Sequence, residues 1–157
     1  MQVAGDGAGG ATAWTKKSPE QILRDLRIIA DQVSIQSGTV RNATHIILSS
    51  QAYNAAAAAM FSGSGGVSAL GAFMRDQDGL SSGKVQIIKS RRLGATGNVH
   101  AIVLDKVPDV IGAWVPMLAQ AAPQRWDALA IKTPVESLIG GAVSADLRGA
   151  AIVEGVI

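Results

Sequence analysis

Residues 18–26, with the sequence SPEQILRDL, carry the strongest local signal in the chain. Ser18 suits the N-cap of a helix, the proline after it suits the first helical position, and Gln21 stands where a capping box needs it. Apolar residues then recur at spacings of four, three and four, which places them on one helix face: Ile22, Leu26, Ile29 and Val33. We predict a helix over 19–36 that ends near Gly38 and buries this face.

Short apolar runs beyond this helix predict the strands of a sheet. His45 opens the run HIIL, which is rich in β-branched residues and bounded by polar ones, as buried strands are. A second helix is expected over 50–61, because serines precede it as caps and a row of alanines follows. The remaining predicted elements are a helix at 67–75 and strands at 84–90 and 98–104. Together they predict an α+β fold, in which helices flank a mixed sheet.

The two ends of the chain differ in composition from this central part. Residues 1–17 begin with a Gly-rich segment, which predicts a flexible N-terminal arm. The tail carries its best strand patterns at 126–133 and 150–157, where little polar alternation predicts strands covered on both faces. We therefore expect an arm at 1–17, an α+β core at 18–125 and a C-terminal group of strands at 126–157.

Composition excludes several classes of protein. Of the 157 residues, 48% are apolar and 17% are charged, so the chain can bury enough side chain to fold. The absence of cysteine excludes disulfides and thiolate chemistry, and a net charge of +2 gives no reason to expect a phosphate-tracking surface. The longest uncharged apolar stretch, near 55–61, is far shorter than the roughly 20 residues that cross a bilayer. Residues 1–14 also lack a secretory signal pattern, so we expect a soluble protein with no membrane partner.

Motifs for catalysis or cofactor binding are weak. Residues 5–10 match G-x-G-x-x-G, but no strand precedes them and no helix opens at their end, so a Gly-rich linker is the better interpretation. His45 and His100 both fall in predicted strands, and no G-x-S-x-G motif accompanies them. Turn chemistry explains the carboxylate pairs without a metal: Asp76 with Asp78, and Asp105 with Asp109. We expect no catalytic residue, no cofactor and no metal site.

Five stretches together resemble the major capsid proteins of tailed bacteriophages: residues 18–26, 43–53, 84–88, 99–104 and 128–157. The resemblance implies the α+β axial domain of such a protein, with C-terminal strands of its peripheral domain. It implies a structural subunit of an icosahedral capsid, which acts by self-assembly and is not an enzyme. It also implies a place in the virion, after synthesis in the cytoplasm of a bacterial host.

The resemblance also implies partners. Family members are longer chains, whose N-terminal arm, extended loop and spine helix would precede residue 1, so this missing N-terminal half is one expected partner. Copies of the chain are the main partner, in pentamers, hexamers or a shell, and enclosed nucleic acid is met only indirectly. In the family, axial-domain loops meet around the five-fold or six-fold centre. The residues expected at such contacts are Gly63, Gly65, Gly66, Arg91, Arg92 and Trp114.

Three alternatives stay open. The first is the related shell of a bacterial encapsulating compartment. The second is a small α/β enzyme that uses His45 or His100 with a neighbouring Asp, although no convergent polar cluster favours it. The third is a nucleic-acid-binding module, although the near-neutral charge balance disfavours it and a solvated sheet edge explains its basic residues equally well. Those basic residues are Lys84, Lys89, Arg91 and Arg92.

Overall fold

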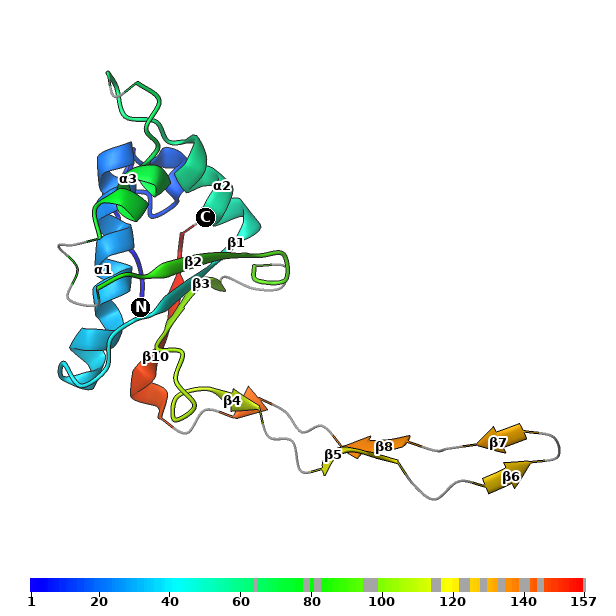
Figure 1. Cartoon of the computed structure of the whole chain (residues 1–157). Helices are drawn as coiled ribbons and strands as arrows, with labels where there is room; N and C mark the ends of the chain where they lie inside the picture. The colour runs from blue at the N-terminus through cyan, green and yellow to red at the C-terminus, as the bar shows by residue number, and fades with distance from the viewer. Residues whose placement is uncertain are drawn as a thin grey trace.

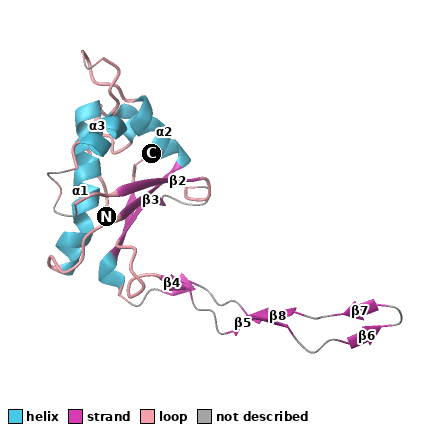
Figure 2. Ribbon diagram, viewed as in Figure 1, coloured by secondary structure: helices cyan, strands magenta, loops and turns pink. Residues whose placement is uncertain are grey.

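Among the described residues, three α-helices pack on one face of a four-stranded sheet, and a two-stranded ribbon projects from this body (Figure 1). The structure is a computed structural model, which describes residues 1–63, 65–77, 80, 83–94, 99–113, 117–121, 125–127, 130–132, 135–138, 142–143 and 146–156. Figure 2 shows that the helices gather in the body, whereas the described part of the ribbon consists of strands. No helix among the described residues is both long and apolar enough to cross a membrane.

Helix α1, Pro19–Ser37, begins and ends where the sequence predicts. Ser18 Oγ accepts a hydrogen bond from the Gln21 amide, and Gln21 Oε1 accepts one from the Ser18 amide, which completes the capping box. Gly38 ends the helix in the left-handed conformation, with φ of 64°. The predicted apolar face is fully buried, which confirms the helical register: Ile22, Leu26, Ile29 and Val33.

The central sheet contains β1 (His45–Ser49), β2 (Gln86–Ser90), β3 (Val99–Leu104) and β10 (Ala150–Glu154). Their order is β10-β3-β1-β2, with β2 parallel to β1 and the other neighbours antiparallel. The sheet is therefore mixed, and the predicted α+β class with helices beside a mixed sheet is confirmed.

Two shorter helices complete the covered face of the sheet. Helix α2, Ser50–Ala58, is capped by Ser49, and helix α3, Ala69–Arg75, is capped by Ser68. Ala52 and Ala56 are fully buried, so α2 lies close to the sheet. The prediction extended this helix to residue 61, but it ends earlier because Met60 forms a β-bridge with Ser68 that turns the chain toward α3. These bounds leave a connecting loop between α2 and α3.

The N-terminal segment, residues 1–17, for which we expect a flexible arm, makes contacts with the body. The short 3-10 helix η1, Trp14–Lys16, buries the Trp14 side chain in the core. The Trp14 indole donates to Asp25 Oδ2 at 3.0 Å, and the Lys17 amino group lies 2.6 Å from the same oxygen. A buried ion pair on α1 thus holds the segment in place, a contact between distant residues that local composition does not reveal.

The ribbon is built from six short strands: β4 (Gly112–Ala113), β5 (Met117–Ala121), β6 (Arg125–Asp127), β7 (Ala130–Lys132), β8 (Val135–Leu138) and β9 (Ala142–Val143). They pair only with one another, as β4–β9, β5–β8 and β6–β7, and they extend away from the body (Figure 1). The predicted single strand at 126–133 is therefore two strands, β6 and β7, that pair with each other.

The C-terminal strand returns to the body through the 3-10 helix η2, Leu147–Gly149. Strand β10 pairs with β3 inside the central sheet, and Val153 and Val156 lie in the same core as α1. Strand β10, which the expected division at 125/126 places with the C-terminal strands, thus belongs to the same sheet as strands of residues 18–125. The ribbon, here residues 112–143, is an insertion between two parts of one body.

Candidate functional site

The glycines Gly63, Gly65 and Gly66 lie in the loop between α2 and α3, called the glycine loop here (residues 61–67). Their φ angles are 74°, 64° and 91°, the left-handed region that favours glycine. A Cβ added to any of them meets no atom within 4 Å, and all three are exposed. Backbone geometry therefore requires glycine here, while the loop leaves its own surface open to contact.

Arg91 and Arg92 follow the end of β2 and are exposed. The Ser90 hydroxyl accepts from the amides of Arg92 and Leu93, both at 3.3 Å, which turns the chain away from the sheet. Arg91 lines a shallow depression of about 160 Å³ beside the first turn of α2, together with Leu93 and Gly94. Both arginines thus lie at the surface in a hydrogen-bonded turn.

The sequence-predicted contact residues lie at opposite ends of α2. Ser50, which begins α2, donates to the Ser90 carbonyl beside the arginines, whereas the glycine loop follows the other end of the helix. A nine-residue helix is about 13 Å long, so the two groups do not form one cluster. Trp114, the remaining candidate, lies outside the described residues.

The basic residues considered for nucleic-acid binding also do not form one group in the structure. Lys89 lies on the helix side of the edge strand β2, where its amino group donates to Asn54 Oδ1 at 2.8 Å and stands 5.2 Å from the Tyr53 ring centroid. Arg91 already lies beyond the strand. Lys89 and Arg91 therefore do not share a strand face, because β2 ends at Ser90.

The two histidines do not form a catalytic cluster in the described structure. His45 Nδ1 lies 2.9 Å from Thr44 Oγ1, and His100 is buried with its Nδ1 unpaired beside Gly94. Both belong to the same face of the sheet, but His45 pairs with Leu104, which lies four positions from His100 along β3. Within the described ranges, no group of three His, Cys, Asp or Glu residues could hold a metal ion.

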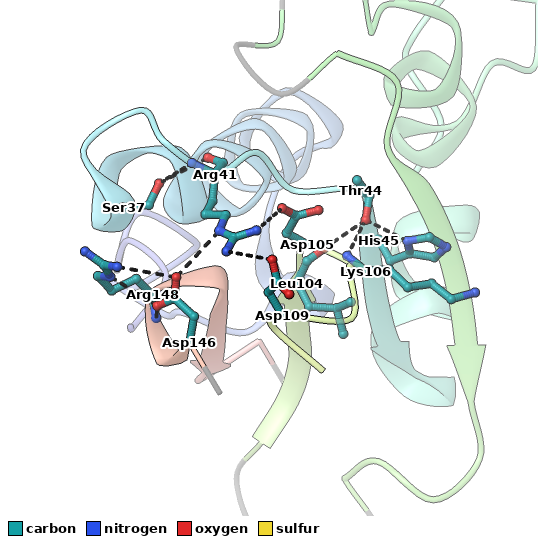
Figure 3. A network of polar contacts seen from close by, with 10 residues as sticks. All are labelled: Ser37, Arg41, Thr44, His45, Leu104, Asp105, Lys106, Asp109, Asp146 and Arg148. Carbon is teal, nitrogen blue, oxygen red and sulfur yellow. Dashed lines mark hydrogen bonds and ion pairs between the residues drawn. The ribbon is translucent and has the colours of Figure 1, made fainter. Parts of the chain in front are cut away.

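A charged cluster that the sequence analysis missed lies where the ribbon leaves the body (Figure 3). The Arg41 guanidinium lies 3.9 Å from Asp105, 3.9 Å from Asp109 and 3.5 Å from Asp146. Asp109 precedes the ribbon and Asp146 follows it, so one arginine binds both of its legs. The signal available in the sequence was the pair Asp105 and Asp109, which turn chemistry alone had explained.

We call this cluster of Arg41, Asp105, Asp109 and Asp146 the ribbon root. Two further contacts strengthen it. The Arg148 side chain and amide both bond Asp146, and these hydrogen bonds hold the pKa of Asp146 below its usual value. The Asp146 carboxylate therefore keeps its charge, and its attraction for Arg41, as the solution becomes mildly acidic. Gly149 packs so closely on buried Val110 that an added Cβ would lie 2.3 Å from a Val110 methyl group. Only glycine lets the outgoing and returning segments meet here.

Comparison with known proteins identifies the fold. Over residues 1–156, the sequence matches the family described as "Major capsid protein". Among solved structures, the chain is similar to one in "The capsid of Myoviridae Phage XM1", with a TM-score of 0.71 and 11% sequence identity. That match covers 92% of this chain and 49% of the other, so this chain spans about half the length of its structural relative. No curated protein matches the sequence.

A mixed four-stranded sheet with helices on one face and a projecting ribbon is thus a fold found in a chain of a phage capsid. The family match extends over nearly the whole sequence. The chain belongs to the major capsid protein family.

Proposed function

We propose that this chain is a structural subunit of an icosahedral capsid of the tailed-phage type, and that it acts by self-assembly rather than by catalysis. The observation that carries the proposal is the match to the major capsid protein family over residues 1–156, together with the shared fold. The ribbon supports it, because its strands extend beyond the body and pair only with one another. A surface of that kind suits contact with neighbouring copies.

The proposal includes partners and location. Copies of the chain form pentamers or hexamers and then a shell, the remaining half of a longer family protein completes the subunit, and enclosed nucleic acid is met only indirectly. The subunit is made in the cytoplasm of a bacterial host and resides in the virion. The fraction of its structural relative that this chain covers supports the need for a further segment.

The contacts between copies are proposed at the glycine loop, at the turn after β2 and at the segment that contains Trp114. The glycine loop and the turn after β2 lie at opposite ends of α2, a separation that suits two different contacts within a ring. Exposed arginines favour pairing with acidic groups of a neighbour. The residues proposed for these contacts are Gly63, Gly65, Gly66, Arg91, Arg92 and Trp114.

Assembly of the 157-residue chain tests this proposal by light scattering at rising protein concentration, in low and high salt. We expect rings that weaken with salt, because screening reduces contacts between exposed charges. The double variant Arg91→Glu/Arg92→Glu is expected to lose these rings, whereas Arg75→Glu, which changes an exposed arginine in the last turn of α3, keeps them. A chain that stays monomeric at millimolar concentration contradicts the proposal.

A further inference from the structure

Residues 1–3 pair with β10, the strand at one edge of the central sheet. The Met1 amino group donates to the Ile152 carbonyl, and the Met1 carbonyl accepts from the Glu154 amide, both at 3.0 Å. Gln2 forms a parallel β-bridge with Glu154. These contacts occupy backbone groups of β10 that point away from the sheet. We call residues 1–3 the N-terminal cover.

The two edges of the central sheet differ in charge. An edge strand presents N–H and C=O groups to which another chain can pair, and charged side chains, lysine above all, oppose such pairing. The far edge strand, β2, carries Lys89 among its five residues. Strand β10 reads AAIV over residues 150–153, with no charged residue before Glu154. Charge therefore does not protect this part of β10, and the N-terminal cover takes its place.

An uncovered β10 is suited to pair with the β10 strand of a second copy. Its sequence is apolar and contains no proline, which is typical of segments that add to one another as strands. In an antiparallel pair centred on Ile152, the two Glu154 carboxylates belong to positions about 14 Å apart along the strands, so they do not oppose the pairing. Such a contact is isologous, because the same surface of each copy meets.

The N-terminal cover packs loosely on the body. A cavity of about 200 Å³ lies between it and α1, where Met1 and Val3 stand opposite Ile28. Side chains that line a void lack the dispersion contacts of a close-packed interior. Val3, which is 5% exposed, is the residue of the cover that reaches the buried core. The attachment of the cover to the body therefore depends mainly on this one side chain and on the pairing with β10.

Separate contacts tie the residues that follow the cover to α1. The Lys17 amino group donates to the Ala4 carbonyl at 2.6 Å and lies 2.9 Å from Asp6 Oδ1. The Gln21 side chain donates to the Asp6 carbonyl at 2.6 Å. Chain termini open locally at a lower free energy than the core does. The cover can thus leave β10 while these contacts hold the rest of the N-terminal segment in place.

We infer that the N-terminal cover is an autoinhibitory contact, which keeps β10 from pairing with the β10 strand of a second copy of this chain. While the cover is in place, the edge of the sheet is closed. When the cover leaves, two copies pair edge to edge. The inference does not depend on the proposed function, because an uncharged sheet edge pairs with its copies whatever the role of the chain.

Cross-linking of the full chain with a short bis-maleimide tests this contact. The chain has no cysteine, so Ile152→Cys places a single thiol on β10, at a side chain that is already largely exposed. Val3→Asp releases the cover, because the core has no partner for the new carboxylate. Dimers linked at position 152 are expected to form at least about tenfold faster with Val3→Asp than with Val40→Asp. Val40 is the matched control, since its side chain is 76% exposed.

Two conditions separate this pairing from other association. High salt screens the charged contacts of the proposed rings but leaves backbone hydrogen bonds between strands intact. In the Val3→Asp chain, a thiol at Ile35→Cys on the exposed side of α1 is expected to cross-link slowly. Dimers that form no faster with Val3→Asp than with Val40→Asp overturn the inference, and so does equal acceleration at Ile35→Cys. Absence of rings in low salt contradicts the proposed function and leaves the cover standing.

A second variant decides the matter where Val3→Asp does not fold. Deletion of Gln2 and Val3 shortens the extended chain by about 7 Å, so that Met1 no longer reaches Ile152, and it places no charge in the core. Circular dichroism checks the fold of each variant. Fast cross-linking at Ile152→Cys in the folded deletion variant supports the inference, and slow cross-linking there overturns it. Unfolding of both variants also overturns it, because the cover then belongs to the cooperative unit of the body and cannot leave alone.

Discussion

Asp25 is the residue on which the N-terminal segment depends. It is buried on α1, and its Oδ2 atom binds both the Lys17 amino group and the Trp14 indole. A buried charge of this kind is stable only while its partners remain, because each ion has given up its hydration. Residues 1–17 are therefore held by an electrostatic contact as well as by the apolar burial of Val3 and Trp14.

Replacement of this carboxylate is the prediction at the residue scale. Asp25→Ala is expected to lower the free energy of unfolding by about 1–3 kcal/mol, since it leaves the buried Lys17 amino group with Asp6 as its one carboxylate partner and the Trp14 indole without its acceptor. Denaturant titration followed by tryptophan fluorescence measures the change. The matched control is Asp31→Ala on the same helix, which is less buried and is expected to cost under about 1 kcal/mol. A loss at Asp25 no larger than at Asp31 contradicts the assigned role.

Elements of this fold divide into those that local sequence predicts and those that it does not. Helix α1 was predicted from Ser18 and its apolar spacing, because capping and periodicity act within a few residues. The fit of β10 beside β3 was not predicted, since pairing across such a separation depends on the whole sheet. Among the candidate contact residues, the glycine loop was found from its glycines alone, whereas the Arg41 cluster joins three segments that only folding brings together.

The prediction at the element scale concerns how Arg41 holds the ribbon root. Arg41→Ala is expected to cost about 1–3 kcal/mol, because it removes the cation beside the largely buried Asp105 and leaves Asp146 with Arg148 alone. Hydrogen exchange should rise at residues 105–111 and 146–149, and stay unchanged in the middle of α1. The matched control is Arg24→Ala, which changes an exposed arginine on α1 away from the root. If hydrogen exchange at the ribbon root stays at the wild-type rate, Arg41 does not hold the two ends of the ribbon together.

At the scale of the whole molecule, the ribbon is separable from the body. The buried core contains residues of the three helices and the central sheet, together with the N-terminal segment. Gly112 pairs with Val143 where the ribbon joins the body. If the ribbon were removed, the two chain ends left on the body would therefore already lie side by side. Among the described strands, those of the ribbon are hydrogen-bonded to one another and not to the central sheet.

Removal of the ribbon is the prediction at this scale. Replacing residues 114–141 with an Asn-Gly turn is expected to leave the body folded and to raise its free energy of unfolding by up to about 2 kcal/mol, since a shorter loop costs less entropy to close. Denaturant titration measures this stability, and circular dichroism checks the fold. An unfolded product would show that the ribbon belongs to the cooperative unit of the body.

The position of β10 has a consequence for synthesis on the ribosome. The Met1 amino group donates to the Ile152 carbonyl, and Val153 and Val156 complete the core, so the first and last segments of the chain close the same sheet. Contacts between residues so far apart form late and slowly in folding. During translation, the ribbon therefore emerges before the sheet can close. The core of the body is completed only once residues 150–156 can pair with β3, so the ribbon waits unfolded or alone until the strand that follows it has been made.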